Sequence, residues 1–427
     1  MDDDQLARVL DKALEQGRYE REDLYLFDTK LAWELTNEAH VRDPERATVF
    51  EALEALPDIV PILGKHLNCG VNAPKLTVPA LGDWLLTRAS RIGANSAVAE
   101  LRNFINSPHC DIEEYLAFSG LEVDTPIALS PELDLLPMSS LPESALSISL
   151  TDPEWSYYGR RANGQVRRKS VETLAAFGKS TWHVNPHIAT ATLKVRRKGL
   201  PKVLPEVAEI GSSADTMLDT LLVLAAATCT AMFPVAHWIS PTPTTPLWGN
   251  FSWSFWSHLN ALRPFATTAG NEANVITAVK AWEAFPTQLK PRLKVPLERL
   301  NRGLAAPAAV DCAIDIGVSL EALLLGDLAP NDQISLAFRL RGAWLLGTNP
   351  VERKDLARHF SAMYSCRSAA VHGGKLPTDG FSVNGIKVSA DEFMMKHGRS
   401  LAAMAILKVI GRADMPDWSA LVLGAGV

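Results

Sequence analysis

Apolar residues recur at spacings of three and four through the first hundred or so residues. This period places them on one side of an α-helix. We therefore predict a helical N-terminal region over residues 1–115. Three apolar stripes support it: Leu6, Val9, Leu10 and Leu14; Phe50, Leu53, Leu56 and Val60; and Leu81, Trp84 and Leu85.

The pattern changes after Pro108. From Gly120 the chain carries short alternating or continuous apolar runs at 121–124, 145–150 and 188–195, each bounded by Pro, Gly, Asp or Asn. A period of two is typical of strands. We predict a mixed, β-containing middle domain over residues 116–245.

Helical periodicity returns in the last third, where we predict a helical domain over residues 246–427. Its helices are expected at about 308–325, 349–373 and 390–410. Asn349, Pro350 and Glu352 are typical of the first residues of a helix, and Gly373 and Gly374 of its end. The predicted fold is mainly α with a small β-containing unit, or α+β overall.

One apolar segment raises the question of a membrane. Residues 221–239 contain no Asp, Glu, Lys or Arg over about the length that a membrane-spanning helix needs. The segment also contains Thr228, Thr230, Pro234 and His237 and is richer in alanine than a typical span. We therefore favour a buried helix over a membrane span.

Composition and charge are those of an ordinary globular protein, with 47% hydrophobic and 21% charged residues. The net charge of −6 provides no overall basic field, so a nucleic-acid site would be a local patch. The five cysteines are scattered without a Cys-x-x-Cys pair, which favours a reducing cytoplasm over disulfides or structural zinc. The acidic segment 1–5 lacks the apolar stretch of a signal peptide. Pro186 interrupts the helical spacing of His183 and His187, so we predict no metal site there. We predict a cytoplasmic protein without a metal or cofactor.

The residues with the clearest chemistry lie at 363–375. Arg367 is in the middle of an apolar stripe formed by Leu356, Phe360, Met363 and Val371, so we expect it to be partly buried. Tyr364, Ser368 and His372 follow at spacings of four on the neighbouring side of the helix. A guanidinium beside an imidazole can hold a phosphate and move protons.

A carboxylate on the preceding helix needs a partner. Glu321 lies at the edge of the apolar stripe of residues 308–325, where an unpaired charge would be costly. The candidate partners are Arg367 and Arg339, the latter beside the expected stripe of Ile334, Phe338, Arg341 and Trp344. A purely structural ion pair is one interpretation of Glu321.

The segment Tyr-x-x-Arg-Ser-x-x-Val-His-Gly at 364–373 resembles the HEPN domain, and most of all its ApeA-like subset. Residues 319–324, Ser-Leu-Glu-Ala-Leu-Leu, resemble the Leu-Glu-x-Leu signature of the first helix of that domain. Residues 334–339, Ile-Ser-Leu-Ala-Phe-Arg, resemble the Leu-Ser-x-Arg that opens its next helix. Three signatures in the right order are more specific than Arg-x4-His alone, and the resemblance covers roughly residues 297–411.

The resemblance implies a metal-independent endoribonuclease that acts as a homodimer through the HEPN-like helices. RNA would be cleaved by attack of its own 2′-OH, leaving a 2′,3′-cyclic phosphate. His372 would be the general acid or base, Arg367 would stabilise phosphate charge, and Ser368 would donate a hydrogen bond. Glu321, Arg339 and Tyr364 would support them. Since such domains serve as toxins or anti-phage effectors, the first two thirds would be a sensor or regulator, with a regulatory or antitoxin partner.

Geometry leaves alternatives open. Five residues are about 140° apart on a helix, so Arg367 and His372 converge only if the helix unwinds near Gly373 or a second copy brings its own pair. The alternative function is a non-catalytic module that binds RNA or a nucleotide, or a dimerisation scaffold. In that case Arg367 pairs with Glu321, and His372 lies at the C-terminal end of the helix because the helix dipole favours a cationic side chain there.

Two basic runs in the middle domain are candidate RNA-binding segments, because aromatic residues lie near them in the sequence. The alternative to RNA binding is that these charged side chains simply cover a solvent-exposed face of a strand. The runs comprise Arg160, Arg161, Arg167, Arg168 and Lys169, and then Lys194, Arg196, Arg197 and Lys198.

Overall fold

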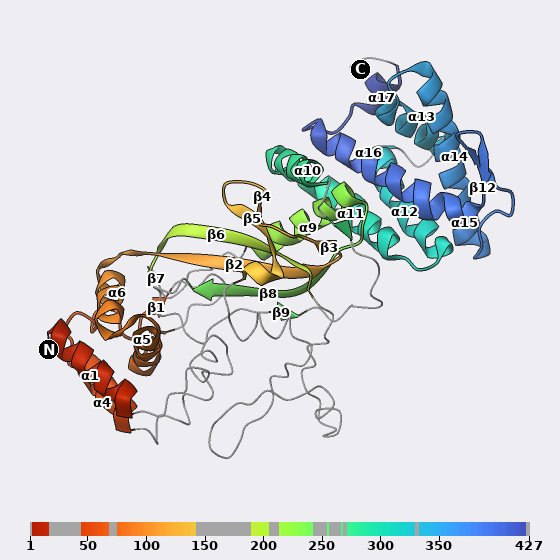
Figure 1. Ribbon diagram of the computed structural model, residues 1–427. Coiled ribbons are helices and arrows are strands. Elements are labelled where there is room, and N and C mark those ends of the chain that lie inside the picture. Colours follow the sequence, from red (N-terminus) through yellow and green to blue (C-terminus); the bar gives the residue numbers. More distant parts are fainter. Residues whose placement is uncertain are drawn as a thin grey trace, which may run out of the picture. The chain divides into compact units, whose positions relative to one another are not determined.

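The computed structural model describes residues 2–16, 44–67, 75–141, 189–204, 213–241, 254–255, 266–267, 271–328 and 333–423. They form two compact units (Figure 1). The first unit comprises Met1–Ser119, Pro131–Asp215 and Pro234–Leu262, and the second Gly120–Ser130, Thr216–Phe233 and Arg263–Val427. The predicted regions divide the chain differently, because helices of the first region and strands of the middle region share the first unit.

Four described helices open the first unit. They are α1 (Asp3–Gln16), α4 (Pro44–Glu54), α5 (Val78–Ile92) and α6 (Ala94–Asn106). Their core contains Leu6, Leu10, Leu53, Leu81 and Trp84, as the apolar spacing predicts. Val60 is the exception at 60% exposed, because α4 ends at Glu54 before that stripe is complete.

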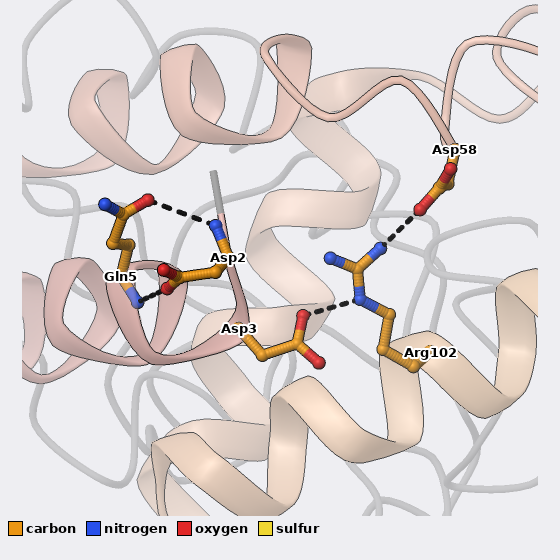
Figure 2. A network of polar contacts seen from close by, with 5 residues as sticks. All are labelled: Asp2, Asp3, Gln5, Asp58 and Arg102. Carbon is orange, nitrogen blue, oxygen red and sulfur yellow. Dashed lines mark hydrogen bonds and ion pairs between the residues drawn. The ribbon is translucent and has the colours of Figure 1, made fainter.

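Polar contacts tie these helices together at their ends. Arg102 on α6 reaches Asp3 of α1 at 2.7 Å and Asp58 at 3.0 Å, and Asp2 and Gln5 close the first turn of α1 (Figure 2). These pairs are solvent-exposed and each contributes little. The Lys202 ammonium is buried instead, and it donates to the carbonyls of Phe104 and Ile105 at the end of α6.

The strands of the first unit form an antiparallel sheet in the order β5-β6-β2-β8-β9. Figure 1 shows β2 and β6 as long neighbours. Their bounds are β2 (His109–Ser119), β5 (Leu133–Pro137), β6 (Ala191–Pro201), β8 (Phe233–Pro241) and β9 (Ser254–Phe255); β1 (His66–Leu67) and β7 (Val203–Leu204) form a separate pair. The predicted strands near 121 and 188–195 are present, and residues 145–150 lie outside the described residues.

The apolar segment 221–239 is not one buried helix, contrary to our expectation. Helix α9 (Ala214–Thr228) ends inside it, Cys229 adopts a positive φ of 51°, and the chain continues as β8. Pro234 and the β-branched residues after it favour a strand over a helix. None of the described helices is both long and apolar enough to cross a membrane.

The second unit is a helical bundle around α12, which packs against α11, α13, α14 and α16 (Figure 1). Its helices are α9, α10 (Glu272–Ala284), α11 (Lys290–Ala305), α12 (Ala309–Leu325), α13 (Ile334–Leu346), α14 (Pro350–Gly373), α15 (Ala390–Glu392), α16 (Arg399–Gly411) and α17 (Trp418–Val422). A π-helical segment, Phe393–Gly398, joins α15 to α16. The short strands are β3 (Leu121–Glu122), β4 (Ile127–Ala128), β10 (Ala266–Thr267), β11 (Phe381–Val383) and β12 (Ile386–Val388). The prediction of a mainly α fold with a small β unit is confirmed.

Candidate functional site

Helix α14 carries the Arg-x4-His segment, and its two ends are set by the local chemistry that its sequence predicts. The Asn349 side chain accepts from the N–H groups of Val351 and Glu352 at 3.1 and 3.0 Å. Glu352 accepts from the backbone and hydroxyl of Thr348, and Gly374 ends the helix with a φ of 65°. A 24-residue helix capped at both ends is a rigid support for Arg367 and His372.

Arg367 points toward α12, where its guanidinium meets Glu321. The Nη2–Oε2 distance is 2.8 Å, and the two side chains are 26% and 22% exposed. Arg367 is therefore the partner of Glu321. The other candidate, Arg339, donates instead to the carbonyl of Ser335 on its own helix, at 3.2 Å.

Gly317 makes this approach possible, a role that a position within residues 308–325 does not reveal by itself. A Cβ atom at Gly317 would lie 2.3 Å from Cγ and 2.7 Å from Cβ of Arg367. The arginine stem therefore lies directly on the backbone of α12. Gly317 and Glu321 are one helical turn apart, so the first receives the stem and the second holds its head.

The guanidinium is only partly satisfied. Its Nε is buried and has no hydrogen-bond partner among the described residues, while Nη2 donates to Glu321. Burial raises the pKa of the Glu321 carboxyl, and Arg367 offsets only part of that effect. Because a guanidinium carries five N–H donors, Arg367 has donors that Glu321 does not use.

His372 leaves the same helix in a different direction. It is exposed, and α14 remains helical to Gly373, so the helix does not unwind there to bring the imidazole beside Arg367. With about 140° between them, the two side chains do not share a face of one chain. Ser368 is half-buried next to Arg367, and Tyr364 packs its ring 5.6 Å from that of Phe338 on α13.

Two expected apolar stripes need correction. Val371 on α14 is 46% exposed and Ile334 on α13 is 40% exposed. Arg341 is buried instead, where it donates to the Leu324 carbonyl at 2.6 Å and pairs with Asp327. The last carbonyl groups of α12 have no partner within their own helix, and Arg341 on α13 supplies a donor to one of them. The sequence alone does not show that α13 packs there.

The second basic run does not form a free cationic surface. On β6, Lys194 lies 3.3 Å from Glu113 and 3.8 Å from Asp134, and Arg196 lies 3.0 Å from Glu113. Arg197 pairs with Glu114 at 3.0 Å, while Lys198 is exposed. Carboxylates on β2 and β5 thus neutralise most of this run. The first run, comprising Arg160, Arg161, Arg167, Arg168 and Lys169, lies outside the described residues.

Glu114 forms a buried polar cluster that sequence reasoning missed. This carboxylate is 0% exposed and lies 2.8 Å from the Ser213 N–H, 3.0 Å from Arg197 and 3.3 Å from His237. Burial acts to raise the pKa of Glu114, but hydrogen bonds from His237, Ser213 and Arg197 outweigh burial and lower it. A carboxylate held on several sides stabilises the sheet and has no open position for a substrate.

The described residues contain no group of three or more His, Cys, Asp or Glu side chains arranged to hold a metal. The pair His183 and His187 lies outside them. The chemistry that the described site offers is thus that of Arg367 with spare donors, a half-buried Ser368 and an exposed His372.

Gly317→Ala tests the close approach of Arg367 to α12. The added methyl group overlaps the Arg367 stem at a point that a rotamer change cannot clear. We expect a loss of about 1–3 kcal/mol in the free energy of unfolding, measured by urea denaturation. Gly411→Ala is the matched control, because no atom lies within 4 Å of its added Cβ and helix propensity favours alanine. Equal stability of the two variants would contradict the packing.

Glu321→Gln tests the electrostatics of the pair. A raised folded-state pKa means that protonated Glu321 favours the fold, so its contribution falls as the pH rises from below the ordinary value of 4.5 through the folded pKa. The stability of the natural protein relative to Glu321→Gln should therefore decrease with pH, as measured by denaturation between about pH 4 and 7.

Glu352→Gln provides a control of opposite sign. Hydrogen bonds from Thr348 lower the pKa of Glu352, so its contribution is present above 4.5 and is lost as the pH falls. The same trend for both variants would argue against the assignment of Glu321.

Comparison of the chain with family models, with curated proteins and with solved structures found no match in any of the three.

Proposed function

We propose that the second unit is a metal-independent endoribonuclease of the HEPN type. The observation that carries the proposal is Arg367: its guanidinium is held by Glu321 through one hydrogen bond, its side chain is 26% exposed, and it has N–H donors that Glu321 does not use. His372 is exposed on the same rigid helix, within the sequence context that resembles the family. In phosphodiester cleavage within RNA, imidazoles can transfer the protons and a guanidinium can stabilise the charge on the phosphate.

In this reaction the RNA 2′-OH attacks its own phosphate. His372 removes the 2′-OH proton as the O2′–P bond forms. A second histidine donates a proton to the leaving 5′-oxygen as the P–O5′ bond breaks. The products are a 2′,3′-cyclic phosphate and a 5′-hydroxyl. Arg367 stabilises the negative charge on the phosphorane oxygens, and Ser368 donates a hydrogen bond to the phosphate.

The site is completed by a second copy of the chain. Because Arg367 and His372 leave α14 about 140° apart, one copy alone does not direct both at one phosphate. A two-fold interface that includes α14 supplies the facing Arg367 and His372, and with them the second histidine. The partners under this proposal are RNA and a second copy of this chain.

The first unit would then be the sensor or regulator of a cytoplasmic toxin or anti-phage effector, restrained by a regulatory or antitoxin partner. This part of the proposal rests on the resemblance of residues 297–411 alone. Neither it nor the cleavage step calls for a cofactor.

A non-catalytic module that binds RNA or a nucleotide, or that serves as a dimerisation scaffold, is the second candidate. The observation in its favour is the Arg367–Glu321 pair itself, which a purely structural role would also explain. This candidate predicts that removing Arg367 weakens ligand binding or dimerisation, without any cleavage to lose.

Cleavage of a mixed RNA pool in excess EDTA tests the nuclease. We expect fragments ending in 2′,3′-cyclic phosphate, and a loss of about 100-fold or more in rate with His372→Ala, because a general acid or base contributes that much. His372 is exposed, so this variant should keep its fold. Arg367→Ala is best combined with Glu321→Gln, so that no half-buried carboxylate is left without its partner.

His109→Ala is the matched control, since it removes another exposed histidine. It should cleave like the natural protein. Equal cleavage by the His372 and His109 variants would assign the activity to another site. No cleavage by any of the proteins would favour the binding module.

A further inference from the structure

Helix α11 has the most basic surface among the described helices of the second unit. It carries five basic residues, Lys290, Arg292, Lys294, Arg299 and Arg302, and one acidic residue, Glu298. In a protein with a net charge of −6, this is a local excess of positive charge. No motif singled it out, because its cations are spaced along a helix and do not form a run.

The exposed basic side chains are spread over the solvent-facing half of α11, with Arg292 and Lys294 about 160° apart around the helix. The buried residues Leu293, Pro296, Leu297, Leu300 and Leu304 form its other side. Arg292, Lys294 and Arg302 are exposed, and Val295 among them is 47% exposed. At 1.5 Å per residue, these cations extend over about 15 Å of the helix surface.

Three of these five cations make neither an ion pair nor a ring contact among the described residues, and Glu298 lies one helical turn from both Lys294 and Arg302. Arg299 pairs with Asp315 at 2.9 Å, and Lys290 lies over the Trp282 ring at 4.8 Å. Arg292, Lys294 and Arg302 pair with no carboxylate among the described residues. The contrast with β6 is direct, because Lys194, Arg196 and Arg197 there are all paired with carboxylates.

We propose that the exposed side of α11 is the surface through which this protein binds the phosphate backbone of single-stranded RNA. A patch of cations without ion pairs, spread over one half of a helix, attracts the phosphates of a nucleic-acid strand, and the release of counterions drives such binding. This proposal rests on the proposed ribonuclease function for the choice of RNA. It moves the binding surface from the basic strand β6 to a helix of the same unit as Arg367.

The test uses the full chain with His372→Ala, so that RNA is bound and not cut. To this chain we add Arg292→Gln, Lys294→Gln and Arg302→Gln. The matched control replaces three exposed basic residues elsewhere in the second unit and outside α14, Lys387, Lys408 and Arg412, with glutamine, for the same change in net charge. Binding of a fluorescent single-stranded RNA is followed by anisotropy over a range of salt concentrations, and circular dichroism checks the folds.

We expect the α11 variant to bind about tenfold more weakly or worse at 0.1 M salt, with a salt slope reduced by about 2, since each lost contact removes about 0.7. The control should bind like the parent. Equal binding by the two variants would overturn the proposal, and so would a parent that binds no RNA. So would an α11 variant that keeps RNA binding but loses self-association, because the surface would then be an interface between copies.

The proposed function is judged separately, by cleavage in the chain with an intact His372. Cleavage that persists when α11 is shown not to bind would remove this inference and leave the nuclease. RNA binding through α11 without cleavage by the natural chain would remove the nuclease and leave this inference.

Discussion

The contact between Arg367 and α12 is the constraint on which the candidate site depends. The arginine stem lies against Gly317, and its guanidinium meets Glu321 one turn further along the same helix. This contact fixes how α14 is rotated against α12, since any side chain at position 317 would push the two helices apart. It thereby also fixes the direction in which His372 points, because α14 is helical from Pro350 to Gly373.

The Arg367–Glu321 pair does not fully compensate for the burial of its two charged groups. Burial raises the pKa of Glu321 more than Arg367 lowers it, and the Arg367 Nε is buried without a partner among the described residues. A pair that served stability alone would be expected to satisfy its donors. The guanidinium has further N–H donors besides the buried Nε, and the Arg367 side chain is 26% exposed, so an anionic ligand has donors to pair with. The Glu114 cluster in the first unit is the contrast, because its carboxylate is enclosed by donors and is 0% exposed.

Local chemistry was predictable from the sequence, and contacts between distant segments were not. Asn349, Pro350 and Gly374 act within one turn of their own helix, so the bounds of α14 follow from the residues alone. The role of Gly317 depends on what lies opposite, and only the packing of α14 on α12 reveals it. Residues 221–239 show the same limit, since an apolar composition does not distinguish the end of α9 from the beginning of β8.

Which charged residues are paired and which are exposed also depends on contacts between distant segments, so the sequence alone did not show it. The basic run on β6 stands out in the sequence, yet Glu113 and Glu114 on the neighbouring strand neutralise much of it. The basic residues of α11 form no continuous run in the sequence, yet Arg292, Lys294 and Arg302 are exposed on this helix. Glu321 could be expected to have a cationic partner, but the choice between Arg367 and Arg339 depends on how three helices pack.

The most direct test of the account is to mix the natural chain with the His372→Ala chain in equal amounts, under conditions that exchange subunits. If the histidines of two copies serve one site, a mixed dimer lacks one of them and is inactive, so only natural dimers cleave RNA. Random mixing should then leave about a quarter of the cleavage rate of natural protein at the same total concentration. A rate of about half, which is expected when each copy carries its own complete site, would contradict the shared site.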